Sequence, residues 1–71
     1  MRIRVNVDDC FIIFEAFYAE YDEEMNGVLF FTLDNDQLWV KINSFDWSVK
    51  SGLLLECGYL DLTCYTAEFY D

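Results

Sequence analysis

The side chains that carry most enzyme chemistry are scarce in this 71-residue sequence. It has no histidine, so the commonest general base and metal ligand is missing, and Ser-His-Asp or Cys-His arrangements cannot form. Its three glycines, Gly27, Gly52 and Gly58, are too dispersed for a phosphate-binding loop. The sequence therefore predicts a protein that is not an enzyme and that holds no cofactor.

The three cysteines, Cys10, Cys57 and Cys64, lie in apolar stretches and match no zinc-ligand spacing. An odd number of cysteines also fits poorly with the disulfide framework of a small secreted domain. We therefore expect buried, free thiols that fill the core and bind no metal.

Carboxylates remain as candidate metal ligands. The segment from Asp22 to Gly27 places acids or an amide at positions 1, 3 and 5 of a calcium-binding loop, and glycine at position 6. The pattern then fails, because Leu33 stands at position 12, where such a loop needs a glutamate that binds through both oxygens. We expect an acidic turn here and no metal site.

The acidity of the chain is its most unusual property. Fourteen Asp and Glu face four Lys and Arg, so the net charge is −10. Such a charge repels nucleic acid and anionic membranes, and the four cations are too scattered to form a phosphate-binding stripe. We expect a positively charged protein groove as the partner, with no direct binding of nucleic acid or membrane. Adaptation to a salty cytoplasm, with the acids forming an ordinary solvated surface, is the alternative.

A row of carboxylates can imitate the phosphates of a nucleic acid. Residues two apart on a strand face lie about 6.6 Å from each other, and residues four apart on a helix about 6 Å. The partner-binding residues that we predict are acids of one expected helix and of the nearby turns: Glu15, Asp22, Glu23, Glu24, Asp34, Asp36 and Asp46.

Aromatic residues are the second unusual feature, at 20% of the chain. Each large ring covers roughly 150–250 Å², so one small core does not readily enclose them all. We expect several rings at the surface, either as anchors for the partner or as a homodimer contact. No apolar run approaches the ~20 residues needed to span a bilayer, and the first residues are no signal peptide, so we expect a cytoplasmic protein.

Two patterns near the N-terminus predict the elements that position these groups. Ile3, Val5 and Val7 alternate with polar residues, which indicates a half-buried strand. The next apolar residues follow helical spacing and predict a helix over about residues 9–25, ended by Asn26-Gly27: Phe11, Phe14, Tyr18, Tyr21 and Met25. A long strand from Phe11 to Tyr21 is the rival, because aromatic residues favour strands and because acids at 22–24 oppose the helix dipole.

The remainder is predicted to be β. Strands 28–33 and 38–42 form a hairpin around the polar turn 34–37. Another strand is expected over 45–49, with a short capped helix after Ser44 as the alternative, and the last two strands over 53–57 and 60–69. We predict one domain of the α+β class, with an antiparallel sheet of five or six strands and the helix packed on a face. An all-β meander or small barrel is the alternative.

In size, acidity and lack of catalytic residues, the chain resembles small acidic phage-encoded inhibitors. These are DNA mimics of the anti-CRISPR or anti-restriction type and inhibitors of uracil-DNA glycosylase. The resemblance covers composition across the whole chain and no aligned motif. It implies an inhibitor of a nucleic-acid-binding host-defence complex that occupies the DNA-binding groove, in the host cytoplasm. An immunity protein, antitoxin or adaptor that binds a basic protein without imitating DNA is the alternative.

Overall fold

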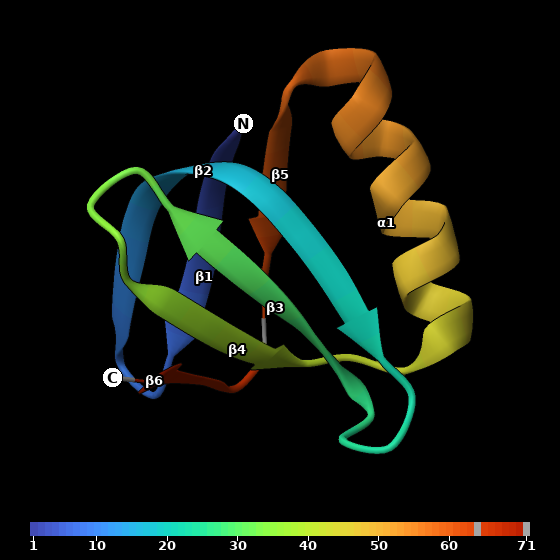
Figure 1. The fold of residues 1–71 in the computed structure, drawn as a ribbon, viewed down its shortest axis with the longest axis horizontal. Helices are drawn as coiled ribbons and strands as arrows, with labels where there is room; N and C mark the ends of the chain where they lie inside the picture. The colour runs from blue at the N-terminus through green and yellow to red at the C-terminus, as the bar shows by residue number, and fades with distance from the viewer. Residues whose placement is uncertain (64, 71) are drawn as a thin grey trace.

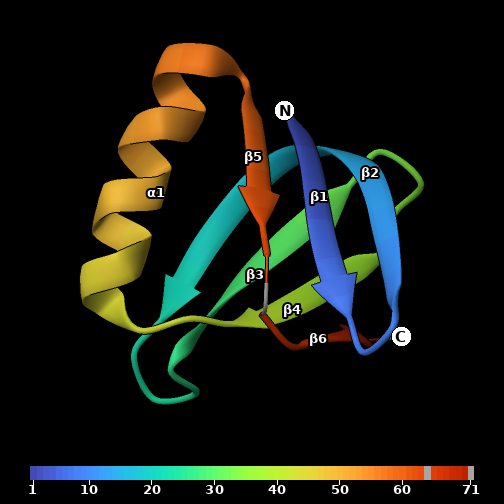
Figure 2. The same ribbon diagram turned by 180° about the vertical axis from the view of Figure 1, so that it is seen from behind.

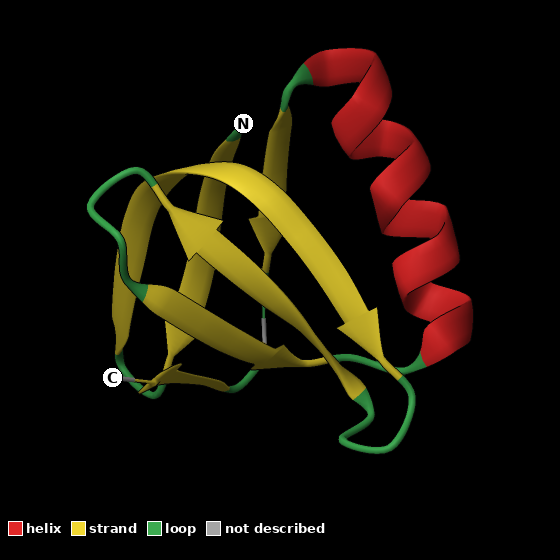
Figure 3. Ribbon diagram, in the orientation of Figure 1, coloured by secondary structure: helices red, strands yellow, loops and turns green. Residues whose placement is uncertain are grey.

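The computed structural model describes residues 1–63 and 65–70 of the chain. Six strands and one helix follow one another in these residues: β1 (Arg2–Val7), β2 (Cys10–Asp22), β3 (Gly27–Thr32), β4 (Gln37–Lys41), α1 (Ser44–Cys57), β5 (Tyr59–Leu62) and β6 (Ala67–Tyr70). The strands form a single sheet in the order β5-β1-β2-β3-β4-β6. This sheet curls into a half-barrel with α1 along its open side (Figures 1 and 3). An α+β fold with one helix is therefore confirmed.

The sheet is mixed, so the prediction of a fully antiparallel sheet is wrong. β1 and β5 run parallel, with Arg2 opposite Tyr59 and Val5 opposite Leu62, whereas every other neighbouring pair is antiparallel. Figure 2 shows these two strands side by side and pointing the same way. Parallel pairing needs a crossover connection, and α1 supplies the one that returns the chain to the β1 edge.

The predicted helix over about residues 9–25 is wrong, and the rival long strand is confirmed as β2. A β-bulge between Ala16 and Tyr18 contributes to the misleading spacing, because it changes the face on which the later residues lie. Phe14 and Tyr21 are seven residues apart, which would place them on opposite faces of a regular strand. The bulge adds one residue to the alternation, so both rings pack against the core. It also bends β2, which pairs with β1 up to Glu15 and with β3 from Ala16 onward.

The strands predicted over 45–49 and 53–57 are wrong as well, because both segments belong to α1. Asn43 caps this helix, since its side chain accepts a hydrogen bond from the Asp46 N–H at 2.7 Å. Gly58 ends it in the left-handed conformation, with φ of 70°. The alternative prediction of a short capped helix after Ser44 was closer to the structure. The helix α1 is longer than predicted, and its cap, Asn43, lies one residue before Ser44.

The hairpin around residues 34–37 is confirmed by β3 and β4, and the first strand by β1. The single strand predicted over 60–69 is wrong, because the chain forms β5 and then β6 there, on opposite edges of the sheet. A sheet edge has only one neighbour to pair with, so these short strands fit that position.

The core lies inside the curl. It is built from the inward side chains of the strands, from Ile42 between β4 and α1, and from one helix residue, Leu54. Trp47 of α1 adds an edge-to-face contact with Phe30 of β3, with ring centroids 5.9 Å apart. The helix α1 lies along the open side of the curl, so the convex side of β2, β3, β4 and β6 stays uncovered by any described element (Figures 1 and 2).

Candidate functional site

The uncovered convex side of the sheet is the best candidate for a binding surface, and we call it the outer face. Strand register defines it, because side chains alternate between the core and this face. Its residues are Tyr18 and Glu20 of β2, Leu29 and Phe31 of β3, Gln37 and Trp39 of β4, and Glu68 of β6. Their inward neighbours Val28, Phe30, Leu38 and Val40 are fully buried.

The centre of the outer face is aromatic. The Tyr18 and Phe31 rings lie 5.6 Å apart, and Phe17, the bulge residue, lies 6.4 Å from Phe31. Phe17 and Tyr18 are each more than half exposed, at 62% and 52%. Rings at this exposure confirm the prediction that aromatic side chains reach the surface, and they are typical of protein contact sites.

Two carboxylates lie in the cross-strand row next to this aromatic centre. Glu20 and Glu68 stand at the two ends of one cross-strand row, with Leu29 and Trp39 between them. Both glutamates are exposed. The sequence analysis missed Glu20, Glu68 and Trp39. The strand alternation of Tyr18, Glu20 and Asp22 would have pointed to this face, had that segment been assigned to a strand.

The seven predicted binding residues do not form one row. Glu15 lines one hollow of about 520 Å³ together with Asp34 and Asp36 of the β3–β4 turn. Asp22, Glu23 and Glu24 lie at the β2–β3 turn, at the other end of the hairpin strand β3 (Figure 1). The helix carrying Asp46 begins near the latter turn, where the Ile42 N–H donates to the Asn26 carbonyl at 3.2 Å. The predicted acids therefore form two groups at opposite ends of β3.

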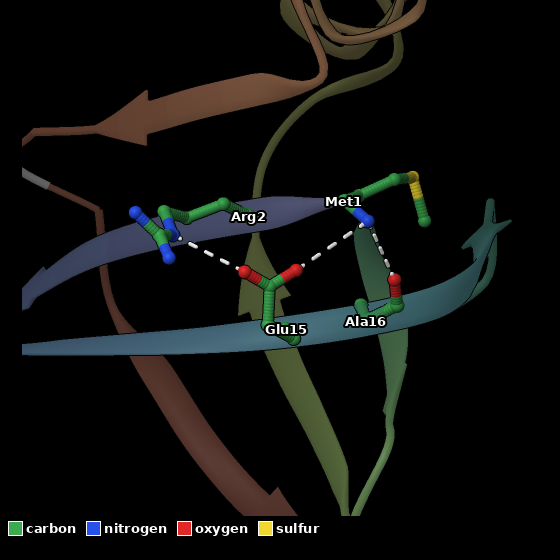
Figure 4. A network of polar contacts seen from close by, with 4 residues as sticks. All are labelled: Met1, Arg2, Glu15 and Ala16. Atoms are coloured by element: carbon green, nitrogen blue, oxygen red, sulfur yellow. Dashed lines mark hydrogen bonds and ion pairs between the residues drawn. The ribbon is translucent and has the colours of Figure 1, made fainter.

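The negative charge of Glu15 is largely neutralised by two neighbouring cations. Its carboxylate accepts a hydrogen bond from Arg2 Nε at 3.1 Å and lies 3.7 Å from the amino group of Met1 (Figure 4). The same amino group donates to the Ala16 carbonyl at 2.9 Å. Glu15 thus ties the start of β1 to β2 and offers little free negative charge to a partner.

Two further predicted acids hold local structure. Asp22 Oδ1 accepts hydrogen bonds from the N–H groups of Glu24 and Met25, at 3.0 and 3.2 Å, and so fixes the β2–β3 turn. Asp46 Oδ2 accepts from the Asn43 side chain at 3.0 Å, in return for the cap that Asn43 provides. Both roles are structural, which residue type and position alone did not reveal.

Four predicted acids remain free among the described residues. The side chains of Glu23, Glu24, Asp34 and Asp36 are exposed and make no hydrogen bond or ion pair there. These carboxylates at the two turns, with Glu20 and Glu68 beside the aromatic centre, form the negative rim of the outer face. Lys41 pairs with Gly27 across β4 and β3. It is the only lysine or arginine among the described residues that pair between β2, β3, β4 and β6.

A hollow of about 460 Å³ opens where the outer face meets the β2–β3 turn, and we call it the Trp39 hollow. It is lined by Glu20, Tyr21, Asp22, Glu23, Glu24, Met25, Leu29 and Trp39. Gly27 makes room for the indole, because a Cβ at this position would overlap Trp39 Nε1. That nitrogen is buried and has no hydrogen-bond partner in the described part of the chain.

The cysteine prediction is wrong for two of the three thiols. Cys10 and Cys57 are free but exposed, because Cys10 follows the β1–β2 turn and Cys57 ends α1. Cys64 lies outside the described residues. Over the ranges 1–63 and 65–70, no group of three or more His, Cys, Asp or Glu side chains is placed to hold a metal ion.

One tyrosine shows a perturbed pKa. Burial against the core raises the pKa of Tyr65 above its usual 10.0, and the nearby Asp46 carboxylate raises it further by opposing a second negative charge. Elsewhere in the described residues, no helix is long and apolar enough to cross a membrane.

Comparisons with protein-family models, curated proteins and solved structures found no match to this chain.

Proposed function

We propose that this chain is a non-enzymatic inhibitor that docks on the positively charged groove of a nucleic-acid-binding complex. The supporting observation is the outer face, whose aromatic centre lies between the acids of the two turns and beside a cross-strand row that ends in Glu20 and Glu68. Aromatic residues are favoured at the centre of protein interfaces, and charged residues at the rim. The resemblance to DNA-mimic inhibitors of the anti-CRISPR type makes a host-defence complex the first target to test.

The amount of charge suits such a groove. The molecule extends 25 × 25 × 24 Å, and a DNA duplex 25 Å long carries about 15 phosphate charges at one per ≈ 1.7 Å. The chain carries fourteen carboxylates over the same length. Its negative potential would draw it to a basic groove at a rate that falls as salt is added. The aromatic centre would then hold the complex by apolar contact.

A competition assay tests the proposal. Purified nucleic-acid enzymes, among them CRISPR effector complexes and restriction enzymes, are loaded with labelled DNA and mixed with the chain. The proposal expects displacement or blocked loading of DNA for a target, with an affinity that weakens from low to high salt. If no complex on the panel releases or refuses its DNA, or if binding is independent of salt, the groove-occupying function is wrong.

The second candidate is an immunity protein, antitoxin or adaptor that binds a basic protein without imitating DNA. The split of the predicted acids into two groups, with an aromatic centre between, favours it over a continuous phosphate-like row. One pair of variants separates the two functions. Neutralising Glu23, Glu24, Asp34 and Asp36 together should abolish groove occupation, whereas Phe17→Ser with Tyr18→Ser should mainly abolish an aromatic-driven interface.

A further inference from the structure

We propose that the Trp39 hollow receives one arginine side chain of the partner, and that this arginine anchors the interface. The inference rests on the proposed function for the basic character of the partner. It goes further because it names the site on this chain at the centre of the interface. It also names the partner side chain that occupies this site.

The floor of the hollow suits a flat cation. Trp39 and Leu29 are neighbours in one cross-strand row, and Met25 adds a third apolar side chain. The indole is half-buried and is held against Gly27, where the missing Cβ leaves room for it. Tryptophan is the aromatic side chain that attracts cations most strongly through its ring face.

The wall of the hollow supplies negative charge. Glu20, Glu23 and Glu24 line it with exposed carboxylates that have no hydrogen-bond or ion-pair partner among the described residues. Asp22 also lines it, and its Oδ1 fixes the turn that carries the two neighbouring glutamates. Among the described residues, the lining includes no lysine or arginine, so the hollow carries negative charge that a cation of the partner would complement.

Arginine fits this combination better than lysine does. Its guanidinium is planar and weakly hydrated, so it stacks on an aromatic face while donating two parallel hydrogen bonds to a carboxylate. A lysine ammonium is a compact, strongly hydrated charge that gains less from an apolar floor. The volume of about 460 Å³ lies within the usual range for a site that accepts a small group.

The test uses the free chain and a small probe, so it needs no identified partner. Nα-acetyl-arginine N-methylamide is titrated into ¹⁵N-labelled protein, and the lysine and neutral citrulline analogues are titrated in parallel. The indole N–H signal of Trp39 and the backbone amides of residues 20–25 report on the hollow. The indole signal of Trp47, which packs against Phe30 in the core, is the internal control.

We expect arginine to give saturable shifts at the hollow and to bind about threefold more tightly than lysine, as a cation–π contact at an exposed site allows. Citrulline should give no saturable shift. Glu20→Gln, Glu23→Gln and Glu24→Gln together should weaken arginine binding about fivefold. The matched control of Asp8→Asn, Asp9→Asn and Glu56→Gln removes the same charge from exposed side chains outside the hollow and its rim, and should leave binding within about twofold.

Equal binding of the three probes, or equal losses in the two triple variants, would overturn the inference. The first result would mean that the hollow does not select a guanidinium, and the second that bulk charge alone attracts it. The two proposals fail separately. Saturable arginine binding without displacement of DNA refutes the groove-occupying function alone, and displacement of DNA without arginine selectivity refutes the Trp39 anchor alone.

Discussion

The ring of Trp47 in α1 meets the ring of Phe30 in β3 edge to face, with an interplanar angle of 81°. Phe30 is fully buried, whereas most large apolar residues of α1 point away from the sheet. Phe45 is 76% exposed and Leu55 is 88% exposed, so the helix contributes little else to the core besides Leu54. The attachment of α1 to the half-barrel therefore depends heavily on two side chains.

Trp47→Ala should consequently destabilise the protein by about 3 kcal/mol, the lower end of the range for a core tryptophan, because Trp47 is only half-buried. Urea unfolding followed by circular dichroism measures this change. Phe45→Ala lies on the same helix but faces solvent, so it should change the free energy of unfolding by no more than about 0.5 kcal/mol. Equal effects of the two substitutions would contradict the role given to Trp47.

Two glycines should respond in opposite directions to alanine. At Gly27 a Cβ would overlap the Trp39 indole and the Val40 carbonyl, so Gly27→Ala should cost about 1–3 kcal/mol. At Gly52, inside α1, a Cβ meets nothing within 4 Å, so Gly52→Ala should stabilise the chain by about 0.5–1 kcal/mol through helix propensity. Thermal unfolding of the two variants beside the parent checks both signs.

The raised pKa of Tyr65 predicts a loss of stability at high pH. The unfolded chain releases this proton near pH 10, whereas the folded chain keeps it to higher pH because of burial and the Asp46 carboxylate. The contribution of Tyr65 is therefore fully present below pH 10 and is lost as the pH rises through the folded value. Unfolding free energies between pH 8 and 11 should fall less steeply for Tyr65→Phe than for the parent. Parallel curves would contradict the assignment.

The net charge of −10 predicts that salt stabilises the folded chain. Few of the carboxylates are paired with cations in the described residues, so folding brings like charges together and screening relieves their repulsion. The midpoint of thermal unfolding should rise between 20 and about 300 mM NaCl. Asp34→Asn with Asp36→Asn should reduce this rise, because the pair flanks one tight turn. A midpoint that falls with salt would contradict this view of the surface.

The sequence pattern predicted an element correctly where a single pattern, such as turn residues or strand alternation, determined it. The hairpin of β3 and β4 is flanked by clear turn residues, and Asn35 takes the positive φ of 67° that such a turn favours. The first strand follows simple alternation. The pattern failed in β2, where apolar residues on both faces and one bulge imitate helical spacing on a strand. It also failed in α1, whose outward residues are as apolar as its inward ones.

The candidate site was predictable in composition and not in arrangement. Negative charge and surface aromatic residues both follow from the residue counts. Pairing across strands decides which of them meet: Glu20, Leu29, Trp39 and Glu68 come from four strands, and only the register places them in one row. Glu15, Asp22 and Asp46 looked equally available in the sequence, yet each is engaged by a nearby backbone or side-chain group.

The parallel pairing of β1 with β5 also sets the order in which the molecule can be completed. Arg2 pairs with Tyr59, so β1 gains its second neighbour only after β5 has been synthesised. Until α1 and β5 have been synthesised, β1 has only β2 beside it, and its other edge is open. Pairings between distant segments slow folding, because the intervening chain must be ordered first. The half-barrel can therefore close only after β5 has been synthesised, and until then the unpaired edge of β1 is open to wrong partners.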